Sequence, residues 1–541
     1  MASEPSRSRE VGKRTSIVSA STIRAVIGAH SCTGMPVRSA GPVSRVAGQR
    51  ATKMSDVFDG DQTFHREKFP VFGVLLGWTT ARTVQRSDVS RGGRMNAATT
   101  ADRVRRKVAR RLLPPLFLMF VLSFLDRTNV ALVKTHLEVD AGIGAAAYGF
   151  GAGVFFVGYA LLGVPSNLVL HRWGARRWLA ALMFVWGLLS CAMALTSGPT
   201  GFYVLRFLLG AAEAGFFPGV ILYLTYWFPA ADRGKATGMF QSAVAVSSII
   251  GNPVGGYLIG LHGLAGLDGW QWMFVLEGAP TVLLALAVPW LLTDRPEDAR
   301  WLTDEEKALL AARIEADRPA EDAHPPRRVR EIVGDSRVLR LMFVYFAIQI
   351  GVYGVTFWLP ALVGRINGLD DVGIGLVSAL PWVCALLGVL VLPWFSDRSG
   401  NRRGPLRLAL ILTAAGLVGG ALLPPVPAVA ALCVAAFGFL GAQPVFWTVP
   451  PTILTGVQMA GTIALISGFG NLGGFLGPYV MGVTESATGS GTNGLYAITL
   501  IVAAGAAVVT GFRWAGLRAA PAASHPTDKE DLTDDPHRAL R

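Results

Sequence analysis

The sequence has little charge for its length. Asp, Glu, Lys and Arg make up only 16% of the 541 residues, whereas 52% are hydrophobic and the mean hydropathy is +0.44. A soluble domain carries about 25% charged residues because its surface faces water. So few charges cannot cover a globule of this size, and we expect most of the chain to face lipid. The composition argues against a soluble enzyme, a nucleic-acid-binding domain and a disordered protein.

Three further features are scarce or absent. Only four cysteines are present, three of them in apolar runs, so no disulfide framework is predicted. The eight histidines fall in tails, loops or the ends of apolar stretches. They cannot build a haem or metal site within the membrane, so we expect no cofactor and no metal, and a membrane-embedded enzyme is disfavoured. A Gly-x-x-x-x-Gly-Lys-Ser/Thr phosphate-binding loop, which ATP-driven transport requires, is also missing.

Apolar stretches long enough to cross a bilayer recur along the chain. About 20 apolar residues are needed to cross about 30 Å of hydrocarbon. We therefore predict an all-α membrane protein with 12 transmembrane helices in two six-helix halves, 95–292 and 339–516. A charged linker, 293–338, joins the halves and is helix-prone from Trp301 to Arg318. The predicted spans lie near 112–132, 148–170, 178–196, 202–228, 236–260, 273–292, 339–363, 373–395, 405–424, 427–449, 457–483 and 493–514.

The two ends of the chain differ from this pattern. Residues 1–94 hold 15 Lys/Arg and 7 Asp/Glu, so much of the net charge of +13 lies there and is no sign of nucleic-acid binding. This segment is interpreted either as a disordered cytoplasmic extension or as upstream sequence before a true start at Met95, which we favour. Residues 517–541 are predicted to be a disordered cytoplasmic tail.

Positive charge is distributed unequally between alternate loops. With the N-terminus inside, the inner segments hold most of the Lys and Arg, whereas the outer loops offer only Lys134 and Arg365. This asymmetry follows the positive-inside rule. We expect a multi-pass protein of the inner or plasma membrane, with both termini and the linker cytoplasmic.

A short repeat supports the division into halves. HRWGARR at 171–177 and DRSGNRR at 397–403 each follow the second span of a half, and both contain Arg-x-Gly-x-Arg-Arg. Basic loops resemble one another by chance as well. Two matching six-span halves are nevertheless typical of duplicated transporters, whose site lies between the halves. A monomer is expected.

Several motifs occur in order along the spans. They are FLDRTN at 124–129, FFVGY at 155–159, VPSN at 164–167, RFLLGAAEAGFFPG at 206–219, GWQWMFVLEG at 269–278, FWTVP at 446–450 and GNLGG at 470–474. With the two basic loops, these motifs resemble the major facilitator superfamily, and within it the anion:cation symporters. The first basic loop departs from the family pattern, because His171 stands where an Asp is usual.

The resemblance implies a secondary active transporter that imports a small organic anion, usually a carboxylate. The imported anion would move with a cation, commonly H⁺ but otherwise Na⁺, by alternating access. The resemblance also suggests that a set of loop charges forms an inner gate. These charges are Arg172, Arg176, Asp397, Arg398 and Arg402. A major facilitator efflux transporter or exchanger of amphiphilic metabolites is the alternative, although such a protein is expected to keep acids rather than arginines at its cavity.

Four charged residues fall well within predicted spans: Asp126, Arg127, Arg206 and Glu213. A charge in mid-bilayer costs at least about 2.5–3.5 kcal/mol, so it normally faces a bundle interior. Adjacent helical residues diverge by about 100°, so Asp126 and Arg127 cannot share one partner. Arg206 and Glu213 are separated by two helical turns and lie on one face. They either hold a ligand or form inter-helix salt bridges.

We hypothesise that Arg127 recognises the substrate carboxylate, because a guanidinium binds carboxylates bidentately. Arg206 is a second substrate-binding candidate. Glu213 and Asp126 are the predicted proton carriers, because binding of an anion to Arg127 offsets the nearby cation and lets a neighbouring acid keep a proton. The resemblance gives these positions similar roles.

Softer substrate-binding candidates are polar or aromatic residues within the spans. Each is equally ordinary as a packing residue. They are Tyr159, Gln241, Trp447, Ser467 and Asn471. Glu277 is expected to tie helices together.

Overall fold

The computed structural model describes residues 92–316, 334–450 and 457–511. The predicted tails fall almost wholly outside these residues. The first half contains α2 (Gly92–Thr128), η2 (Asn129–Ala131), α3 (Lys134–Asp140), α4 (Ala145–Trp173), α5 (Ala175–Ala192), η3 (Met193–Leu195), α6 (Pro199–Glu213), α7 (Phe216–Trp227), α8 (Ala230–Gln241), α9 (Ala243–Ile259), η4 (Leu264–Gly266) and α10 (Gly269–Leu291). The linker contains η5 (Pro296–Asp298) and α11 (Asp304–Ala316). The second half contains α13 (Ser336–Val363), α14 (Asp371–Ser399), α15 (Arg403–Leu422), α16 (Pro425–Trp447), α18 (Val457–Thr488) and α19 (Thr492–Gly511).

Eleven helical segments of the described residues are long and apolar enough to cross a membrane. They coincide with 11 of the 12 predicted spans. The remaining prediction, 457–483, falls on α18, which forms a helix of 32 residues but is not among the 11. The total of 12 spans therefore stays a prediction.

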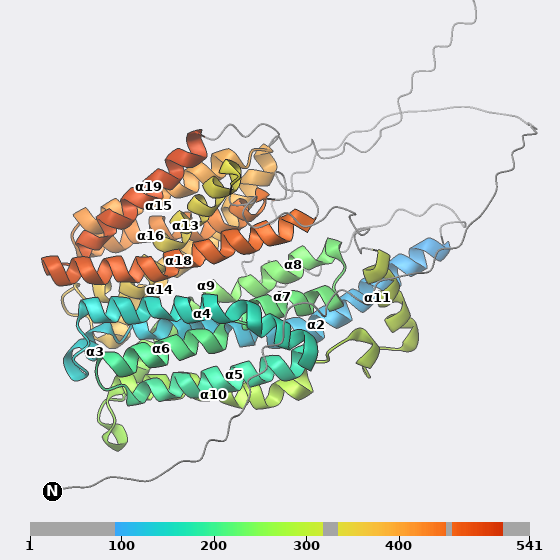
Figure 1. The fold of residues 1–541 in the computed structure, drawn as a ribbon, viewed down its shortest axis with the longest axis horizontal. Helices are drawn as coiled ribbons and strands as arrows, with labels where there is room; N and C mark the ends of the chain where they lie inside the picture. Colours follow the sequence, from blue (N-terminus) through green and yellow to red (C-terminus); the bar gives the residue numbers. More distant parts are fainter. Residues whose placement is uncertain (1–91, 317–333, 451–456, 512–541) are drawn as a thin grey trace, which may run out of the picture. The chain divides into compact units, whose positions relative to one another are not determined.

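The two halves meet through two long helix pairs. α4 packs along α18, and α9 packs along α14 (Figure 1). α4 and α14 are the second long helices of their halves, whereas α9 and α18 are the fifth. Each contact therefore joins the second helix of one half to the fifth helix of the other half, so the two contacts are equivalent if the halves are interchanged. This is the relation expected of duplicated six-helix repeats, and it supports the repeat inferred from the basic loops.

The fourth predicted span, 202–228, is broken into α6 and α7. Pro218 has no N–H to donate to the carbonyl of Ala214, which weakens the helix at this turn. A Cβ at Gly215 would overlap the hydroxyl of Ser166, so a glycine is required where α4 passes the break. The break leaves Glu213 as the last residue of α6. The fifth predicted span is likewise interrupted, between α8 and α9.

Helix ends outside the bundle also differ from the prediction. α2 begins at Gly92, 20 residues before the first predicted span, because the basic stretch continues as helix into the apolar one. α11 begins at Asp304 rather than at Trp301. The Glu306 amide donates to the Thr303 hydroxyl, and the Thr303 amide donates to the Glu306 carboxylate. This capping box fixes the start of α11.

The two ends of the bundle carry different segments of the chain. We call the end that carries residues 103–111 and 293–316 the linker end. The opposite end, which carries the connections 129–144 and 364–370, is the distal end.

The two halves are joined at the distal end. Lys134 of α3 forms an ion pair of 2.9 Å with Glu485 of α18, and the Trp358 indole also donates to that carboxylate. The Tyr148 hydroxyl donates to the carbonyl oxygen of Phe357 across the halves at 3.1 Å. His136 lies 3.6 Å from a carboxylate oxygen of Asp371. These contacts close the distal end.

Candidate functional site

An ion pair between α2 and α6 lies at the centre of the first half. The Arg127 guanidinium donates to Oε2 of Glu213 at 2.8 Å, and the Ser123 hydroxyl donates to the same oxygen at 3.2 Å. Glu213 is fully buried, and Arg127 is 8% exposed. A buried carboxylate needs a charged partner, because an isolated one is costly in a medium of low dielectric constant. The predicted substrate-binding and proton-carrying residues are thus brought together.

Arg206 lies on the same face of α6 as Glu213, as the spacing predicts. Its guanidinium donates to the carbonyl oxygen of Arg127 at 3.4–3.5 Å and is fully buried. Its Cζ lies 4.9 Å from the ring centre of Phe155 and 5.8 Å from that of Phe357. A cation over aromatic faces is stabilised by the ring quadrupoles. Arg206 therefore anchors the end of α2 and contacts both halves of the chain.

Close packing of α4 against α6 allows this arrangement. A Cβ at Gly210 would overlap the carbonyl oxygen of Phe155, so only a glycine lets the two backbones approach so closely. Small residues commonly permit such contacts between membrane helices. The approach brings Phe155 and Tyr159 beneath the Arg127 guanidinium, with both ring centres 5.1 Å from its Cζ.

The second half meets the ion pair with aromatic and amide side chains. Tyr353 of α13 lies close enough to interact with the charge of Arg127, and its ring centre is 4.4 Å from that of Phe156. Trp447 packs on Tyr345, with ring centres 4.8 Å apart. Gln349, on the same helix as both tyrosines, is buried and its side-chain oxygen has no hydrogen-bond partner among the described residues. Tyr353 is thus the contact of the second half with the buried charges, and Gln349 lies between the two tyrosines on the same helix, against Gly473 of α18.

Asp126 points away from Arg127, toward α5 and α10. Its carboxylate accepts hydrogen bonds from the Ser190 hydroxyl at 2.7 Å and the Thr281 hydroxyl at 3.0 Å. This confirms that the two adjacent charges take different partners. Asp126 is buried, and it has no ion pair with a cation among the residues that the structure describes.

Glu277 of α10 faces Asn129 and the α9 residue Gly255, and its expected role in tying helices together stays a prediction. It is 5% exposed, and neither of its carboxylate oxygens has a hydrogen-bond partner in the described part of the chain. Its electrostatic neighbours are Asp126 and the amide of Asn129, which is also buried and without a hydrogen bond there. Two acids thus lie near each other in an apolar interior, where two negative charges are strongly unfavourable.

The remaining predicted substrate residues lie further from this cluster of contacts. Gln241 is the last residue of α8 and is exposed. Ser467 and Asn471 are half-buried on α18. Their roles stay predictions.

The predicted gate residues lie at the linker end. Arg176 contacts Asp294, with its amide donating at 2.8 Å and its Nε 3.6 Å from the carboxylate. Arg402 donates to the carbonyl oxygen of Thr448 at 2.6 Å. Arg172, Asp397 and Arg398 are exposed. A latch between charges of the two halves is not formed by these residues, and their gating role stays a prediction.

Several residues of the site were not singled out from the sequence. Ser123, Ser190, Thr281, Gln349 and Tyr353 are polar or amphipathic residues within apolar stretches, which is a recognised signal of function in membranes. Many other hydroxyl residues in the spans, such as Thr356 and Thr413, only donate to their own helix backbone. Polar residues within apolar stretches can therefore be recognised from the sequence, but the sequence does not show which of them belong to the site.

Comparison with known proteins supports this architecture. The family model of the Major Facilitator Superfamily matches residues 116–478, with a second match over 341–537. A quinolone resistance transporter of Acinetobacter baumannii is 41% identical over 73% of this chain and 92% of its own length. A putative tartrate transporter of Agrobacterium vitis is 42% identical over 73% of this chain and 88% of its own. Both relatives are named as transporters, so the chain is a transporter and not an enzyme.

The fold is similar to that of a solved transporter. A bacterial homologue of the human lysosomal transporter Spinster, in an inward-facing and unoccupied conformation, has a TM-score of 0.62 and 20% identity. The similarity covers 75% of this chain and 96% of that one. With its many apolar helices, the protein is a multi-pass membrane transporter that belongs to the Major Facilitator Superfamily.

Proposed function

We propose that this protein imports a small organic anion bearing a carboxylate, together with H⁺, by alternating access. The observation that carries the proposal is the buried ion pair between Arg127 and Glu213. It supplies one guanidinium able to bind a carboxylate and one acid able to carry a proton, in direct contact with each other. The relative named as a putative tartrate transporter supports an organic acid as the substrate class.

Substrate and proton are coupled through competition for Arg127. Without substrate, Glu213 neutralises the guanidinium. An incoming carboxylate takes over this interaction, because a guanidinium binds carboxylates bidentately. Glu213 is then a buried charge without a partner, which is costly until it takes up a proton. Loading the anion therefore favours loading H⁺ in the same step.

Asp126 and Glu277 form a second acidic site beside the first. Because Asp126 has no cation partner among the described residues and the buried Glu277 lies within its electrostatic reach, we propose that the two acids share one proton. Asp126 accepts two hydroxyl hydrogen bonds, so it is the better place for the negative charge and Glu277 for the proton. Arg206 acts as a positioning residue, because it holds the carbonyl oxygen of Arg127.

We propose that the site is reached from the linker end in this conformation. The distal end is closed by the contacts of Lys134, His136 and Tyr148 with the second half. If the linker end is cytoplasmic, as the loop charges predict, this is the state that releases substrate into the cell. In the opposite state the gate residues at 172–176 and 397–402 would close the linker end.

The proposal is tested by replacing Glu213 with Gln in protein reconstituted into liposomes. Uptake of labelled carboxylates, tartrate first, is measured under an imposed pH gradient, and exchange is measured with substrate on both sides. Glu213→Gln should abolish uphill accumulation while preserving exchange, because the neutral amide cannot release a proton. Glu138→Gln, which changes an exposed acid of α3, is the matched control.

Two outcomes would refute the proposal. One is uphill uptake by Glu213→Gln equal to that of the unmodified protein. The other is accumulation driven by a Na⁺ gradient and indifferent to the pH gradient, which would assign Na⁺ as the coupling ion.

Efflux is the second candidate, because one relative is named as a quinolone resistance transporter. The aromatic side chains of Tyr345, Tyr353 and Trp447 suit a planar amphiphile as well as an organic acid. The two functions differ in direction. Export predicts increased quinolone tolerance of expressing cells and no uphill carboxylate uptake, whereas import predicts the reverse.

A further inference from the structure

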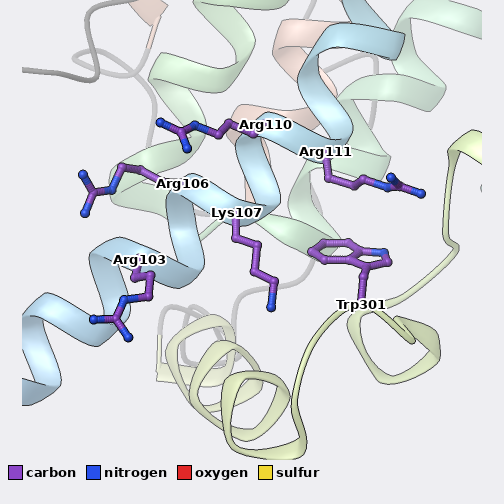
Figure 2. Close-up of a pocket in the computed structure, with 6 residues that line it drawn as sticks. All are labelled: Arg103, Arg106, Lys107, Arg110, Arg111 and Trp301. Atoms are coloured by element: carbon purple, nitrogen blue, oxygen red, sulfur yellow. The ribbon is translucent and has the colours of Figure 1, made fainter.

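A pocket rich in positive charge lies where α2 approaches its apolar stretch. It has a volume of about 540 Å³ and is lined by five cations and one indole: Arg103, Arg106, Lys107, Arg110, Arg111 and Trp301. We call these six residues the basic pocket. Figure 2 shows the five cations along α2, with Trp301 of the linker facing the same helix. This pocket is at the linker end, away from the Arg127–Glu213 ion pair.

The sequence places these cations on one side of a helix. Arg103, Lys107, Arg110 and Arg111 recur at intervals of three, four and seven residues, whereas Val104, Val108 and Leu112 are buried on the other side. Residues spaced three or four apart lie on one helical face. The amphipathic start of α2 is therefore held in the bundle by its apolar side and presents its cations outward.

Only a small part of this positive charge is neutralised. Lys107 forms an ion pair of 2.6 Å with Glu306 of α11, and this contact holds the pKa of Glu306 below its ordinary value. The guanidinium groups of Arg103, Arg106, Arg110 and Arg111 make no ion pair with a carboxylate in the described ranges. Four like charges around one pocket repel each other unless an anion lies among them.

The position of the pocket indicates which anion it suits. Arg111 directly precedes Leu112, where the first predicted span begins, so we expect the arginines to lie near the level where the helix enters hydrocarbon. Trp301 stacks on Trp227 with ring centres 5.5 Å apart, and Trp is favoured at the membrane interface. Guanidinium groups match the oxygens of phosphate. We propose that the basic pocket binds the phosphate group of an anionic membrane lipid.

The experiment compares lipids and variants on the purified full-length protein in neutral detergent. Binding of short-chain phosphatidylglycerol, phosphatidylcholine and inorganic phosphate is measured by thermophoresis. The test variant is Arg106→Gln with Arg110→Gln. The matched control is Arg177→Gln with Arg407→Gln, two exposed arginines outside the pocket. Thermal midpoints of both variants verify that they fold.

The protein should bind phosphatidylglycerol in preference to phosphatidylcholine. Its affinity for phosphatidylglycerol should fall as the salt concentration is raised. Each lost cation near an anionic headgroup should cost about fivefold in affinity, so the test variant should bind about 25-fold more weakly. The control should bind as the unmodified protein does. Equal binding of the two lipids, equal losses in test and control variants, or arginine-dependent binding of inorganic phosphate without lipid preference would each overturn the proposal.

Discussion

The two halves of this transporter have related helices but bring different chemistry to the centre. In the first half, α2, α6 and α10 contribute five buried charges: Asp126, Arg127, Arg206, Glu213 and Glu277. In the second half, the charged residues of α13 and α14 lie at the helix ends, and the central face offers Tyr345, Gln349 and Tyr353. The two halves are thus similar in how their helices pack but differ in where ionisable side chains are buried.

This difference suggests a division of labour. Charges that must be neutralised in pairs suit ion coupling, because each binding event changes what the neighbouring group requires. Aromatic and amide groups suit recognition of the organic body of a substrate, because they provide contact area and a few oriented hydrogen bonds. The comparison therefore predicts that substitutions in the first half disrupt coupling, whereas those in the second half change affinity.

The largest effect is expected for Arg127→Gln. Breaking a buried ion pair costs about 3–5 kcal/mol, so uptake should fall at least about 100-fold and the thermal midpoint should drop. Adding Glu213→Gln removes the orphaned charge and should restore the midpoint but not the uptake. Arg177→Gln is the control. Recovery of uptake in the double variant would show that Arg127 has only a structural role.

A smaller effect is expected for Gln349→Leu in the second half. Its buried side-chain oxygen has no hydrogen-bond partner among the described residues, and we propose that a substrate supplies one. Losing one such hydrogen bond costs about 1 kcal/mol, so KM should rise about fivefold with the proton coupling unchanged. Thr356→Val on the same helix, which removes only an intrahelical bond, should leave KM unchanged. A lost pH dependence in Gln349→Leu would contradict the division between halves.

Opposite changes in stability are expected for the two acids near α10. Glu277→Gln removes a carboxyl group that has no hydrogen-bond partner in the described ranges and should stabilise the protein by about 1 kcal/mol. Asp126→Asn replaces one of the two carboxylate oxygens that accept hydrogen bonds from Ser190 and Thr281. This variant should destabilise the protein by about 1–2 kcal/mol. Chemical unfolding in detergent measures both. Destabilisation of equal size in both variants would show that Glu277 is satisfied in the same way as Asp126.

The smallest effect is expected at the distal end, where the halves meet. The hydrogen bond to Asp371 raises the pKa of His136 above its ordinary value, with the charges of Asp371, Asp140 and Asp268 acting in the same direction. A raised folded-state pKa stabilises the folded form below pH about 6.5, and this contribution is lost as pH rises through the folded value. Both side chains are about one-third exposed, so the contribution is under about 1 kcal/mol.

His136→Gln tests this contact. Its thermal midpoint should lie below that of the unmodified protein at pH 5.5 and match it at pH 8.5. A difference that is the same at both values would mean that the His136 charge contributes nothing to closing the distal end.

Much of the fold was predictable because a bilayer restricts the choices. Only apolar stretches of sufficient length can cross it, so 11 of the predicted spans coincide with spanning helices. The break at Ala214–Gly215 was missed because composition is apolar on both sides of it, and the break at Ser242 was missed because hydropathy does not register a one-residue interruption of a helix. The start of α2 was missed for the opposite reason, since hydropathy identifies the membrane portion of a helix and not its polar extension.

The candidate site was predictable as a set of residues but not as a set of partners. Buried charges are rare enough that Asp126, Arg127, Arg206 and Glu213 could be chosen individually. Helical spacing also required Asp126 and Arg127 to diverge. Which helix each would meet depends on how α2 packs against α9 and α10, because that packing decides which side chains reach α5 and α6, and it is a property of contacts distant in sequence.

By itself the sequence determined that this chain is a membrane protein, which apolar stretches are long enough to cross the bilayer, and which charges must be buried inside. Those features follow from the cost of placing polar groups in hydrocarbon, which acts on each segment separately. The tertiary structure alone decided that Arg127 meets Glu213, that Asp126 meets hydroxyls, and that Glu277 has no hydrogen-bond partner among the described residues. These outcomes depend on the orientation of several helices at once, because a pairing forms only where two side chains arrive at the same point.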